Sequence, residues 1–576
     1  MSKSATHLRK GGLREALLAG VLLILLGGVQ GIAASSPSDD LAIAPSNQSI
    51  IITPLTNDNF AGSNQAAILQ VTKPAHGTVT ISSNAAVLTP QLSNLFAFAA
   101  IQMSNTVVQV NSTNLYPRRT LPNGTWSNVA NSDWVSGFFP GTMWYIYEHT
   151  HDTNFLNWAR KWTAGISSQK NVTTTDDIGF MFNTSFGTGF RISGDTNYRS
   201  ILLTAANSLS TRYSSTVRSI EDDRTLSPTQ FEVILDTMMN GDLLYYMTDV
   251  AGDTNYAWKI YNHQLRAMTN QVRLDGSTYH RAVYGRSTGA LVFQGTRAGY
   301  ADWSTWSRGH SWAIYMFTKG YIETGYQPFL DTAQRVSDYY VTNVPADFVP
   351  YWDYQAPNIP NEPRDSSAAA VALSGMLQLS QVVTNQTNAA KYWLEAHNIF
   401  ESLASTNYLA TGTSNKSILL HGTGETPVLP QPETNVGLIY GDYYFVESMH
   451  RYAVLYGQTN LIYTPNAGFT GTDTFCYTVG DSAGNLTNAI VTVVVQPTNS
   501  APPFAATVAA PPAVAEPLVS FPTVSGYLYD VQYRDDVANG AWQILKTNVL
   551  GTGGTVSVAD PGATNTPTRV YRVMAH

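Results

Sequence analysis

The chain of 576 residues is poor in cysteine and in charge. Its one cysteine, Cys476, excludes an intramolecular disulfide and a multi-cysteine metal site. Charged residues make up only 12% and the net charge is −8, so nucleic-acid binding has no electrostatic support. Hydrophobic residues make up 43%, and Asn, Thr, Ser and Tyr are plentiful. This balance is typical of a secreted protein that handles a neutral or polar ligand.

Long apolar runs are also lacking, except near the start of the chain. A basic segment with Arg9, Lys10 and Arg14 leads into the short apolar run 16–29, and small residues at 31–34 resemble a cleavage site. This pattern predicts a signal peptide over residues 1–34 and a secreted, periplasmic or cell-surface bacterial protein. An uncleaved membrane anchor is the alternative.

Two short β-rich stretches lie almost 400 residues apart. Residues 35–94 contain short strands such as His76 to Ile81, and residues 458–497 contain Tyr463 to Asn485 and a run of valines. Together they resemble one bacterial cadherin-like or immunoglobulin-like repeat. We therefore expect residues 95–457 to be a domain inserted into one loop of a β-sandwich, since loop tips tolerate insertion. Two unrelated half-modules are the alternative.

The intervening region repeats a short loop after apolar helical runs. The loop occurs at 149–155, 192–199, 250–257, 323–330, 382–392 and 455–463. Its spacing predicts one helix pair per repeat and a closed (α/α)6 barrel with apolar inner helices. The sequence therefore predicts a multidomain protein with an all-α catalytic barrel inside a β-sandwich. A Pro/Ala-rich linker at 498–516 and a small C-terminal β module at 517–576 follow.

The stretch from Ser227 to Met247 carries a carboxylate among apolar residues. Ser227, Pro228 and Gln230 predict a capped helix start. The helix would be apolar on nearly every side and hence buried, with Asp236 in its second or third turn. Burial predicts a raised pKa for Asp236, which would suit a general acid. A structural carboxylate satisfied by its neighbours is the alternative.

Four further stretches stand out, at 133–144, 176–180, 275–280 and 299–317. In this order, and with the Asp236 stretch, they resemble the unsaturated glucuronyl hydrolases of glycoside hydrolase family 88 over about residues 115–452. The resemblance implies an (α/α)6 barrel that needs no cofactor or metal. It also implies as substrates the unsaturated uronyl oligosaccharides that polysaccharide lyases release, from glycosaminoglycans or similar polymers. In that reaction an acid protonates C4 of the terminal uronic acid, water adds at C5, and the resulting hemiketal collapses.

The resemblance also implies roles for individual residues. Asp236 would be the acid that then helps to activate water, and Asp177 would bind ring hydroxyls and interact with Asp236. For Asp177 taken alone, a helix N-cap is the alternative. The remaining predicted substrate-binding residues are aromatic or basic: Trp134, His280, Trp306, Arg308 and His310. An internal salt bridge is the alternative for Arg308.

The sequence departs from the family pattern at two positions near the site, and also in the motif 308–312, where His310 and Ser311 replace the usual glutamine and alanine. Ala298 stands where the family often has a glutamine, and Trp303 where it often has an aspartate. These changes leave the parent polymer open. An unsaturated rhamnogalacturonyl hydrolase acting on pectin fragments is therefore a rival hypothesis. A non-catalytic glycan-binding surface protein is a second rival, because β modules flank the helical region.

Overall fold

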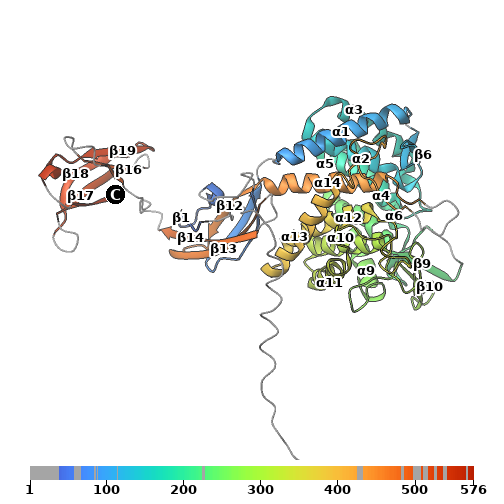
Figure 1. Ribbon diagram of the computed structural model, residues 1–576. Helices are drawn as coiled ribbons and strands as arrows, with labels where there is room; N and C mark the ends of the chain where they lie inside the picture. Colours follow the sequence, from blue (N-terminus) through green and yellow to red (C-terminus); the bar gives the residue numbers. More distant parts are fainter. Residues whose placement is uncertain are drawn as a thin grey trace, which may run out of the picture.

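The computed structural model describes residues 38–575 except for short gaps (Figure 1). The gaps are 57–65, 84–85, 87, 113, 224–226, 425–432, 482–485, 497–506, 510–516, 524–527, 536–540 and 566–568. The predicted signal peptide at 1–34 and most of the predicted linker at 498–516 lie outside the described residues. Within the described part of the chain, no helix combines the length and the apolar character needed to cross a bilayer.

Buried helices form a ring at the centre of the helical region. They are α2 (Phe138–Thr150), α4 (Ile178–Phe182) with α5 (Thr188–Ser193), α7 (Leu235–Asn240) with α8 (Asp242–Ala251), α10 (Ser307–Thr324), α12 (Ser366–Val382) and α14 (Ile439–Tyr456). Each contacts the next, directly or through the π-helical turn that joins α4 to α5, and α14 contacts α2, which closes the ring. Helices α10 and α12 are buried along most of their length, because other helices surround them in this position.

A second set of helices packs around the ring. They are α1 (Pro90–Val110), α3 (Thr153–Ile166), α6 (Thr196–Ser210), α9 (Thr254–Asn270), α11 (Gln327–Asn343) and α13 (Gln386–Leu403). Five of the six repeated loops join an inner helix to the outer helix that follows it, and the sixth joins α14 to strand β12 (Gln458–Pro465). In three of these loops an Asp caps the outer helix: Asp152, Asp195 and Asp253 accept from a backbone N–H at 2.8, 3.0 and 3.0 Å. The prediction of a helical core is confirmed.

The predicted helix from Ser227 to Met247 is wrong in its first third. Residues Gln230–Ile234 form strand β9, which pairs antiparallel with β10 (Arg281–Gly285), and β10 pairs in turn with β11 (Leu291–Gly295). Phe231 and Val233 bury their side chains in this small sheet. Helix α7 starts only at Leu235, so Asp236 lies in its first turn. A short apolar run fits either a helix or a buried strand, and here the partner strand decides between them.

Strands from both sides of the helical core share two sheets. The strand order is β1-β14-β13-β3 in one sheet and β2-β12-β4 in the other. The strands are β1 (Asp40–Pro45), β2 (Ile50–Ile52), β3 (Ala66–Val71), β4 (Gly77–Ser83), β12 (Gln458–Pro465), β13 (Gly471–Asp481) and β14 (Leu486–Gln496). Leu461 of β12, for example, pairs with Ile52 on one side and Ile81 on the other. The β-rich stretches that lie almost 400 residues apart therefore fold together.

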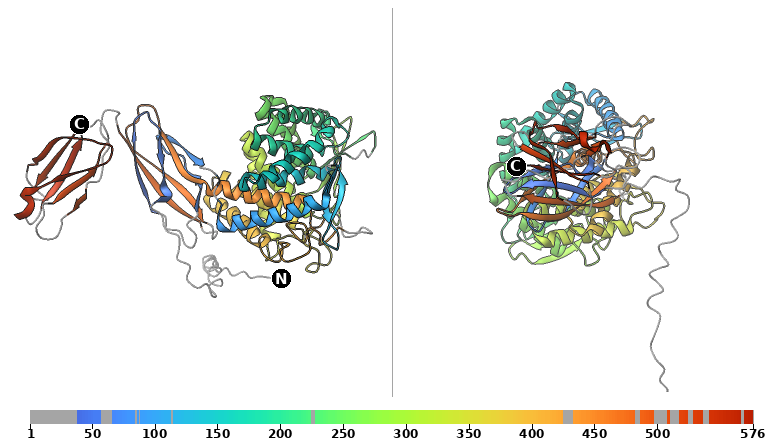
Figure 2. Two further views of the ribbon diagram at one scale, coloured as in Figure 1. Left: turned by 90° about the horizontal axis from the view of Figure 1, so that it is seen from above. Right: turned by 90° about the vertical axis from the view of Figure 1, so that its left-hand side faces the viewer.

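The C-terminal module is a separate pair of small sheets, β15-β16-β19 and β18-β17-β20. Its strands are β15 (Thr507–Ala509), β16 (Leu518–Pro522), β17 (Leu528–Arg534), β18 (Gln543–Leu550), β19 (Thr555–Ala559) and β20 (Val570–Ala575). The predicted linker thus contains β15, which pairs with β16. In Figure 2 this module lies beyond the β12–β14 sheets, on the side away from the helical core. Two hairpins contact the helical core. They are β5 (Leu115–Thr120) with β6 (Trp126–Ala130), and β7 (Tyr213–Ser214) with β8 (Ser219–Ile220).

Candidate active site

A cavity of about 440 Å³ opens where the inner helices begin. Trp134 begins the 3-10 turn (Trp134–Gly137) that leads into α2, Asp177 precedes α4, and Asp236 lies in the first turn of α7. Tyr440 and Arg308 lie at the starts of α14 and α10. All five side chains line this cavity. Helix N-termini carry partial positive charge, so their convergence favours an anionic ligand.

Asp236 is paired with a histidine whose tautomer is determined by its surroundings. His280 Nδ1 accepts from the backbone N–H groups of Arg297 and Ala298, both at 3.3 Å. Its Nε2 therefore carries the ring hydrogen and donates it to Asp236 Oδ2 at 3.0 Å. Burial lowers the pKa of His280, so the ring is neutral near neutral pH. A neutral histidine thus donates to an aspartate whose side chain is 20% exposed.

The prediction of a raised pKa for Asp236 is wrong for the free enzyme. Burial does oppose ionisation of this carboxyl. However, the hydrogen bond from His280 and the positive charges of Arg297 and Arg308 outweigh burial and lower its pKa. The sequence shows the apolar neighbours of Asp236 along the chain. It does not show these three partners, which come from segments 44–72 residues away.

Asp177 has the opposite protonation behaviour. Burial, together with the charges of Asp176 and Asp223, raises its pKa well above the ordinary value. The side chain does not cap α4: Asp177 Oδ1 accepts from Asn240 Nδ2 at 3.2 Å, and Thr175 Oγ1 lies 3.3 Å from Oδ2. Asp177 thus occupies the N-cap position of α4, but the N-cap alternative does not account for its side chain, which makes no capping hydrogen bond. The cavity holds one carboxyl that favours its proton and one that favours ionisation.

Asn240 connects the two carboxyl segments. Its Oδ1 accepts from the backbone N–H of Phe180 at 2.6 Å, and its Nδ2 donates to Asp177 Oδ1 and, at 3.4 Å, to the carbonyl oxygen of Asp236. Gly179 permits this contact, because a Cβ there would lie 2.1 Å from the Asn240 carbonyl oxygen. The Asp-Ile-Gly-Phe sequence at 177–180 therefore places Asp177 beside α7.

Two further acids lie beside the pair. Asp176 and Asp222 are almost fully buried, and burial raises the pKa of each. Arg297 forms an ion pair with Asp222. Asp176, Asp222 and Asp223 lie close enough to share a cation, but Arg297 already occupies the neighbourhood of Asp222. These neighbouring acids therefore oppose ionisation of Asp177, because its ionised form would place one more negative charge among them.

Aromatic rings form part of the cavity wall. Trp134 lies against Tyr440 and Phe180, with ring centroids 4.9 and 5.4 Å away. Trp306 lies against His280 at 4.5 Å. Flat rings of this kind offer stacking faces for sugars. Trp134, Trp306 and His280 therefore lie where the sequence predicts substrate-binding residues.

Arg308 lines the cavity, but its guanidinium is already bound. Nη1 donates to Asp365 Oδ2 at 2.8 Å and to the Thr423 carbonyl oxygen at 2.6 Å, while Nη2 donates to the Gly424 carbonyl oxygen at 2.7 Å. This is the internal salt bridge that was the alternative for this residue. Arg308 therefore contributes mainly positive charge to the cavity wall. Its guanidinium carbon lies 4.6 Å from the centre of the Trp306 ring.

The prediction that His310 binds substrate is wrong. Its ring is fully buried, outside the cavity, and Nε2 lies 2.9 Å from the Val336 carbonyl oxygen of outer helix α11. Burial lowers the pKa of His310 to about 3. Residues two positions apart in a helix point in directions about 200° apart around its axis. His310 therefore points away from the side that Arg308 faces.

Five polar residues of the cavity wall were not predicted from the sequence: Arg118, Asp222, Asp223, Arg297 and Tyr440. Arg297 immediately precedes Ala298, and Tyr440 lies in a stretch that resembles the family, so both could have been found. Asp222 and Arg118 belong to no motif. Of the two departures near the site, Ala298 lines the cavity, whereas Trp303 is 63% exposed and lies outside it.

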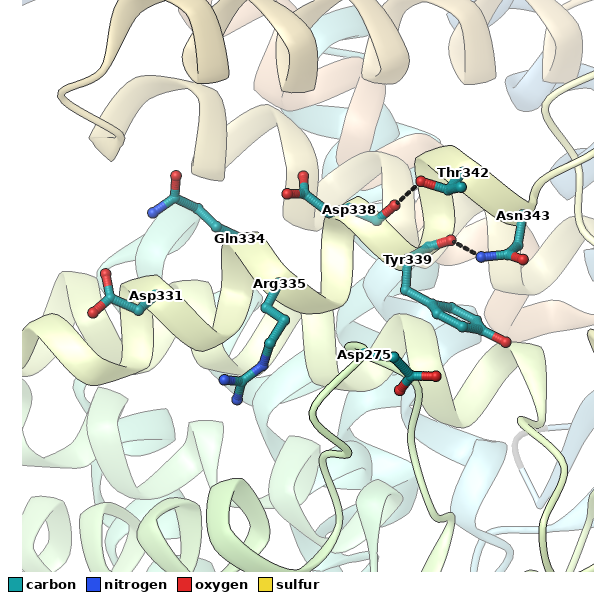
Figure 3. A pocket seen from close by; sticks show the side chains of 8 residues that line it. All are labelled: Asp275, Asp331, Gln334, Arg335, Asp338, Tyr339, Thr342 and Asn343. Carbon is teal, nitrogen blue, oxygen red and sulfur yellow. Dashed lines mark hydrogen bonds between the residues drawn. The ribbon is translucent and has the colours of Figure 1, made fainter. Parts of the chain in front are cut away.

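A larger cavity, of about 680 Å³, lies elsewhere (Figure 3). Helix α11 and the loop at Asp275 line it, and the figure shows the side chains of α11 along one wall. Two of them, Thr342 and Asn343, donate to backbone carbonyl oxygens of the same helix. This cavity has one aromatic ring, Tyr339, and none of the aspartates discussed above. Size alone therefore does not identify the active site.

A helical ring whose inner N-termini surround paired carboxyls and aromatic rings suits an enzyme that acts on carbohydrates. The chain belongs to glycosyl hydrolase family 88, whose sequence profile matches residues 106–462. A bacterial Ig domain profile matches residues 437–494 and overlaps the first match at α14. Both resemblances seen in the sequence are thereby confirmed, and the protein is a glycosidase.

Several relatives have known names or structures. The chain is 37% identical over 328 residues to an unsaturated glucuronyl hydrolase of Formosa agariphila, covering 56% of this chain and 80% of the relative. It is 29% identical to an unsaturated chondroitin disaccharide hydrolase of Streptococcus agalactiae, covering 58% and 85%. A solved unsaturated glucuronyl hydrolase specific for heparin superimposes with a TM-score of 0.60 at 33% identity, covering 63% of this chain and 97% of that one.

Proposed function

We propose that this enzyme removes the terminal 4,5-unsaturated uronic acid from oligosaccharides released by polysaccharide lyases. The reaction is hydration of the C4=C5 vinyl ether, followed by collapse of the hemiketal that forms at C5. Family membership and the names of the relatives support this reaction. The observation that carries the residue assignment is the pair Asp177 and Asp236, which line one cavity with opposite protonation preferences.

Asp236 acts as acid and base in this proposal. In its protonated form it delivers a proton to C4, and the carboxylate then takes a proton from the water that adds at C5. The uronate carboxylate of the substrate brings a negative charge into a cavity bordered by Arg118, Arg297 and Arg308. That charge offsets the cations that now lower the pKa of Asp236, so its pKa rises when substrate binds.

Asp177 stays neutral and positions the sugar. A protonated carboxyl can both donate to and accept from a ring hydroxyl, which suits the place of Asp177 next to Asn240. Trp134 and Trp306 offer ring faces and restrict water at the reacting carbons. His280 orients Asp236 through its Nε2–H.

We propose fragments of glycosaminoglycans as the substrates. Relatives are named for chondroitin disaccharides and for heparin, and one solved neighbour is complexed with dGlcA-GalNAc6S. Ala298 leaves space at the cavity wall where the family often has a glutamine, so the second sugar is a separate question from the uronic acid. Unsaturated rhamnogalacturonyl fragments of pectin are the competing substrates.

We further propose that the helical core is an (α/α)6 barrel inserted in one β-sandwich, with residues 35–94 and 458–497 as the halves. The pairing of β12 with both β2 and β4 supports the insertion, and the start of α1 at Pro90 moves the first boundary a few residues earlier. The basic and apolar pattern of residues 1–34 supports export, to the periplasm, the cell surface or the medium. The C-terminal module would then act as a spacer or contact surface outside the cytoplasm.

One assay tests the proposed reaction. Unsaturated disaccharides from chondroitin, heparin and rhamnogalacturonan are offered separately, and the ultraviolet absorbance of the C4=C5 bond is followed. Loss of absorbance with the glycosaminoglycan disaccharides is the expected result. Loss with the pectin fragment alone would replace the proposed substrate. Binding of all three without loss of absorbance would support the non-catalytic alternative and overturn the proposal.

A further inference from the structure

A cluster of possible metal ligands lies at the opposite end of the helical ring from the active site. Glu148 and His149 belong to the last turn of α2, and His450 belongs to the last two turns of α14. His149 Nε2 and His450 Nδ1 are 3.0 Å apart, and Glu148 Oε2 is 3.3 Å from His450 Nδ1. The three ligand atoms all lie within 4.8 Å of one another. We propose that these residues bind one divalent transition-metal ion, with Zn²⁺ as the best match.

The donor set and the spacing fit such an ion. Two imidazole nitrogens and a carboxylate oxygen suit Zn²⁺, which lies about 2.0–2.1 Å from nitrogen ligands. Two nitrogens 3.0 Å apart can both contact one ion at that range after a shift of a few tenths of an ångström. A hydrogen bond between two neutral rings is the simpler explanation of the short distance. It does not by itself account for a carboxylate converging on the same nitrogen.

The surroundings keep the donors in their ligating forms. Burial lowers the pKa of His149 to about 4 and of His450 to about 3, so both rings are neutral near neutral pH. Arg191 holds Glu148 with two hydrogen bonds, of 2.6 and 2.8 Å, and leaves a second lone pair on Oε2. Hydrogen-bonded carboxylates are common in metal sites. The nearby cations are Arg191 and Arg451, and Glu148 and Glu447 oppose them.

Packing orients both rings, and a cavity reaches them. The His149 ring lies 4.3 Å from Phe96, and the His450 ring lies 5.0 Å from Tyr145. His450 lines a cavity of about 290 Å³, which gives an ion and its remaining water ligand access. Helix C-termini also favour positive charge, and two inner helices end here.

The position suggests a structural role. Helix α2 is the first inner helix of the ring and α14 is the last, and the two pack side by side. One ion held by both would cross-link the ring where it closes. This role is independent of the proposed reaction, because none of the three residues lines the active-site cavity.

The test uses the full chain without an affinity tag, stripped with a chelator and titrated with Zn²⁺ by calorimetry. We expect one equivalent to bind, and His149→Gln and His450→Gln each to weaken binding at least tenfold. His151→Gln is the matched control, since His151 is exposed and only two residues from His149. Zn²⁺ should raise the Tm of the wild type and leave that of His450→Gln unchanged. Binding to the wild type that is no tighter than to the His149→Gln/His450→Gln double variant would overturn the proposal.

A second measurement needs no variant. Diethyl pyrocarbonate modification is mapped by mass spectrometry with and without Zn²⁺. We expect Zn²⁺ to protect His149 and His450 and to leave His151 reactive. Equal protection of all three, or of none, would contradict a site at this position even if the variants failed to fold. Mg²⁺ serves as the control ion, because it prefers oxygen ligands.

Discussion

The two ends of the helical ring hold their buried acids in different states. At the end where the inner helices finish, acids face bases: Arg191 pairs with Glu148 at 2.6 Å, and Lys319 pairs with Glu323 at 2.6 Å. At the cavity end, no Lys or Arg in the described part of the chain forms an ion pair with Asp176 or Asp177. Their pKa values are raised by burial and by the charges of neighbouring aspartates, whereas the pKa of Glu148 is lowered.

This difference separates charge that stabilises the fold from charge that is available for chemistry. Paired acids hold helices together and stay ionised. Acids without a basic partner hold protons near neutral pH, and such groups are concentrated at catalytic sites. Asp236 lies between these cases, because His280 and nearby arginines favour its ionised form until an anionic substrate arrives.

The largest expected effect comes from Asp236→Asn. The fold should remain, since Asn keeps an oxygen that can accept from His280 Nε2–H. Turnover should fall by about 10²–10⁴-fold, the usual contribution of a general acid–base group. The measurement is loss of the C4=C5 absorbance at saturating substrate. The matched control is Asp242→Asn at the start of α8, outside the cavity, which should change Tm and leave turnover within a few-fold. Near-full activity of Asp236→Asn would remove this residue as the acid.

Asp177→Asn should have a smaller effect. If Asp177 works as a neutral hydrogen-bonding group, an amide replaces most of its function, and kcat/KM should fall by about tenfold to a hundredfold. The loss should appear mainly in KM. A loss in kcat as large as that of Asp236→Asn would show that Asp177 itself transfers a proton. Steady-state kinetics of both variants on one disaccharide makes the comparison.

These assignments show where sequence reasoning succeeds and where it stops. The capped loops at Asp152, Asp195 and Asp253 are local, so the repeat of helix pairs could be predicted from neighbouring residues. Strand β9 could not, because its partner β10 lies about 50 residues further along the chain. Helical spacing alone could have excluded His310 once Arg308 was assigned to the cavity side.

Protonation was the part of the site that the sequence could not settle. The family motifs bring Asp177 and Asp236 to one cavity, as expected. Their pKa values depend on His280, Arg297 and Asp176, whose distances arise only in the folded chain. An apolar sequence context predicts burial, but burial alone does not give the direction of a pKa shift.

The pH profile examines Asp236 directly. A general acid must be protonated, so the rate falls as pH rises through its pKa. The pKa of Asp236 is lowered in the free enzyme and should rise with substrate bound, so kcat/KM should fall at lower pH than kcat. His280→Ala removes the hydrogen bond that lowers this pKa, and should move the kcat/KM limb to higher pH. It should also reduce kcat/KM by about tenfold, as expected for the loss of a hydrogen bond to a charged group. Coincident limbs in the wild type would contradict the proposed effect of the substrate carboxylate.

The smallest effects are on stability and have opposite signs at the two ends of the ring. The folded-state pKa of Asp176 is raised, so its contribution to stability is complete below its unfolded pKa and is lost as pH rises through the folded value. Asp176→Asn cannot ionise and should raise Tm at pH 8 relative to the wild type, by about 2–4 °C, with a smaller rise at pH 5. The pKa of Glu148 is lowered, so its contribution is present above the unfolded pKa and is lost as pH falls. Glu148→Gln should therefore lower Tm at pH 8. Thermal unfolding of both variants between pH 5 and pH 8 tests this comparison. Tm shifts of the same sign at pH 8 would show that the buried acids at the two ends of the ring are not balanced differently.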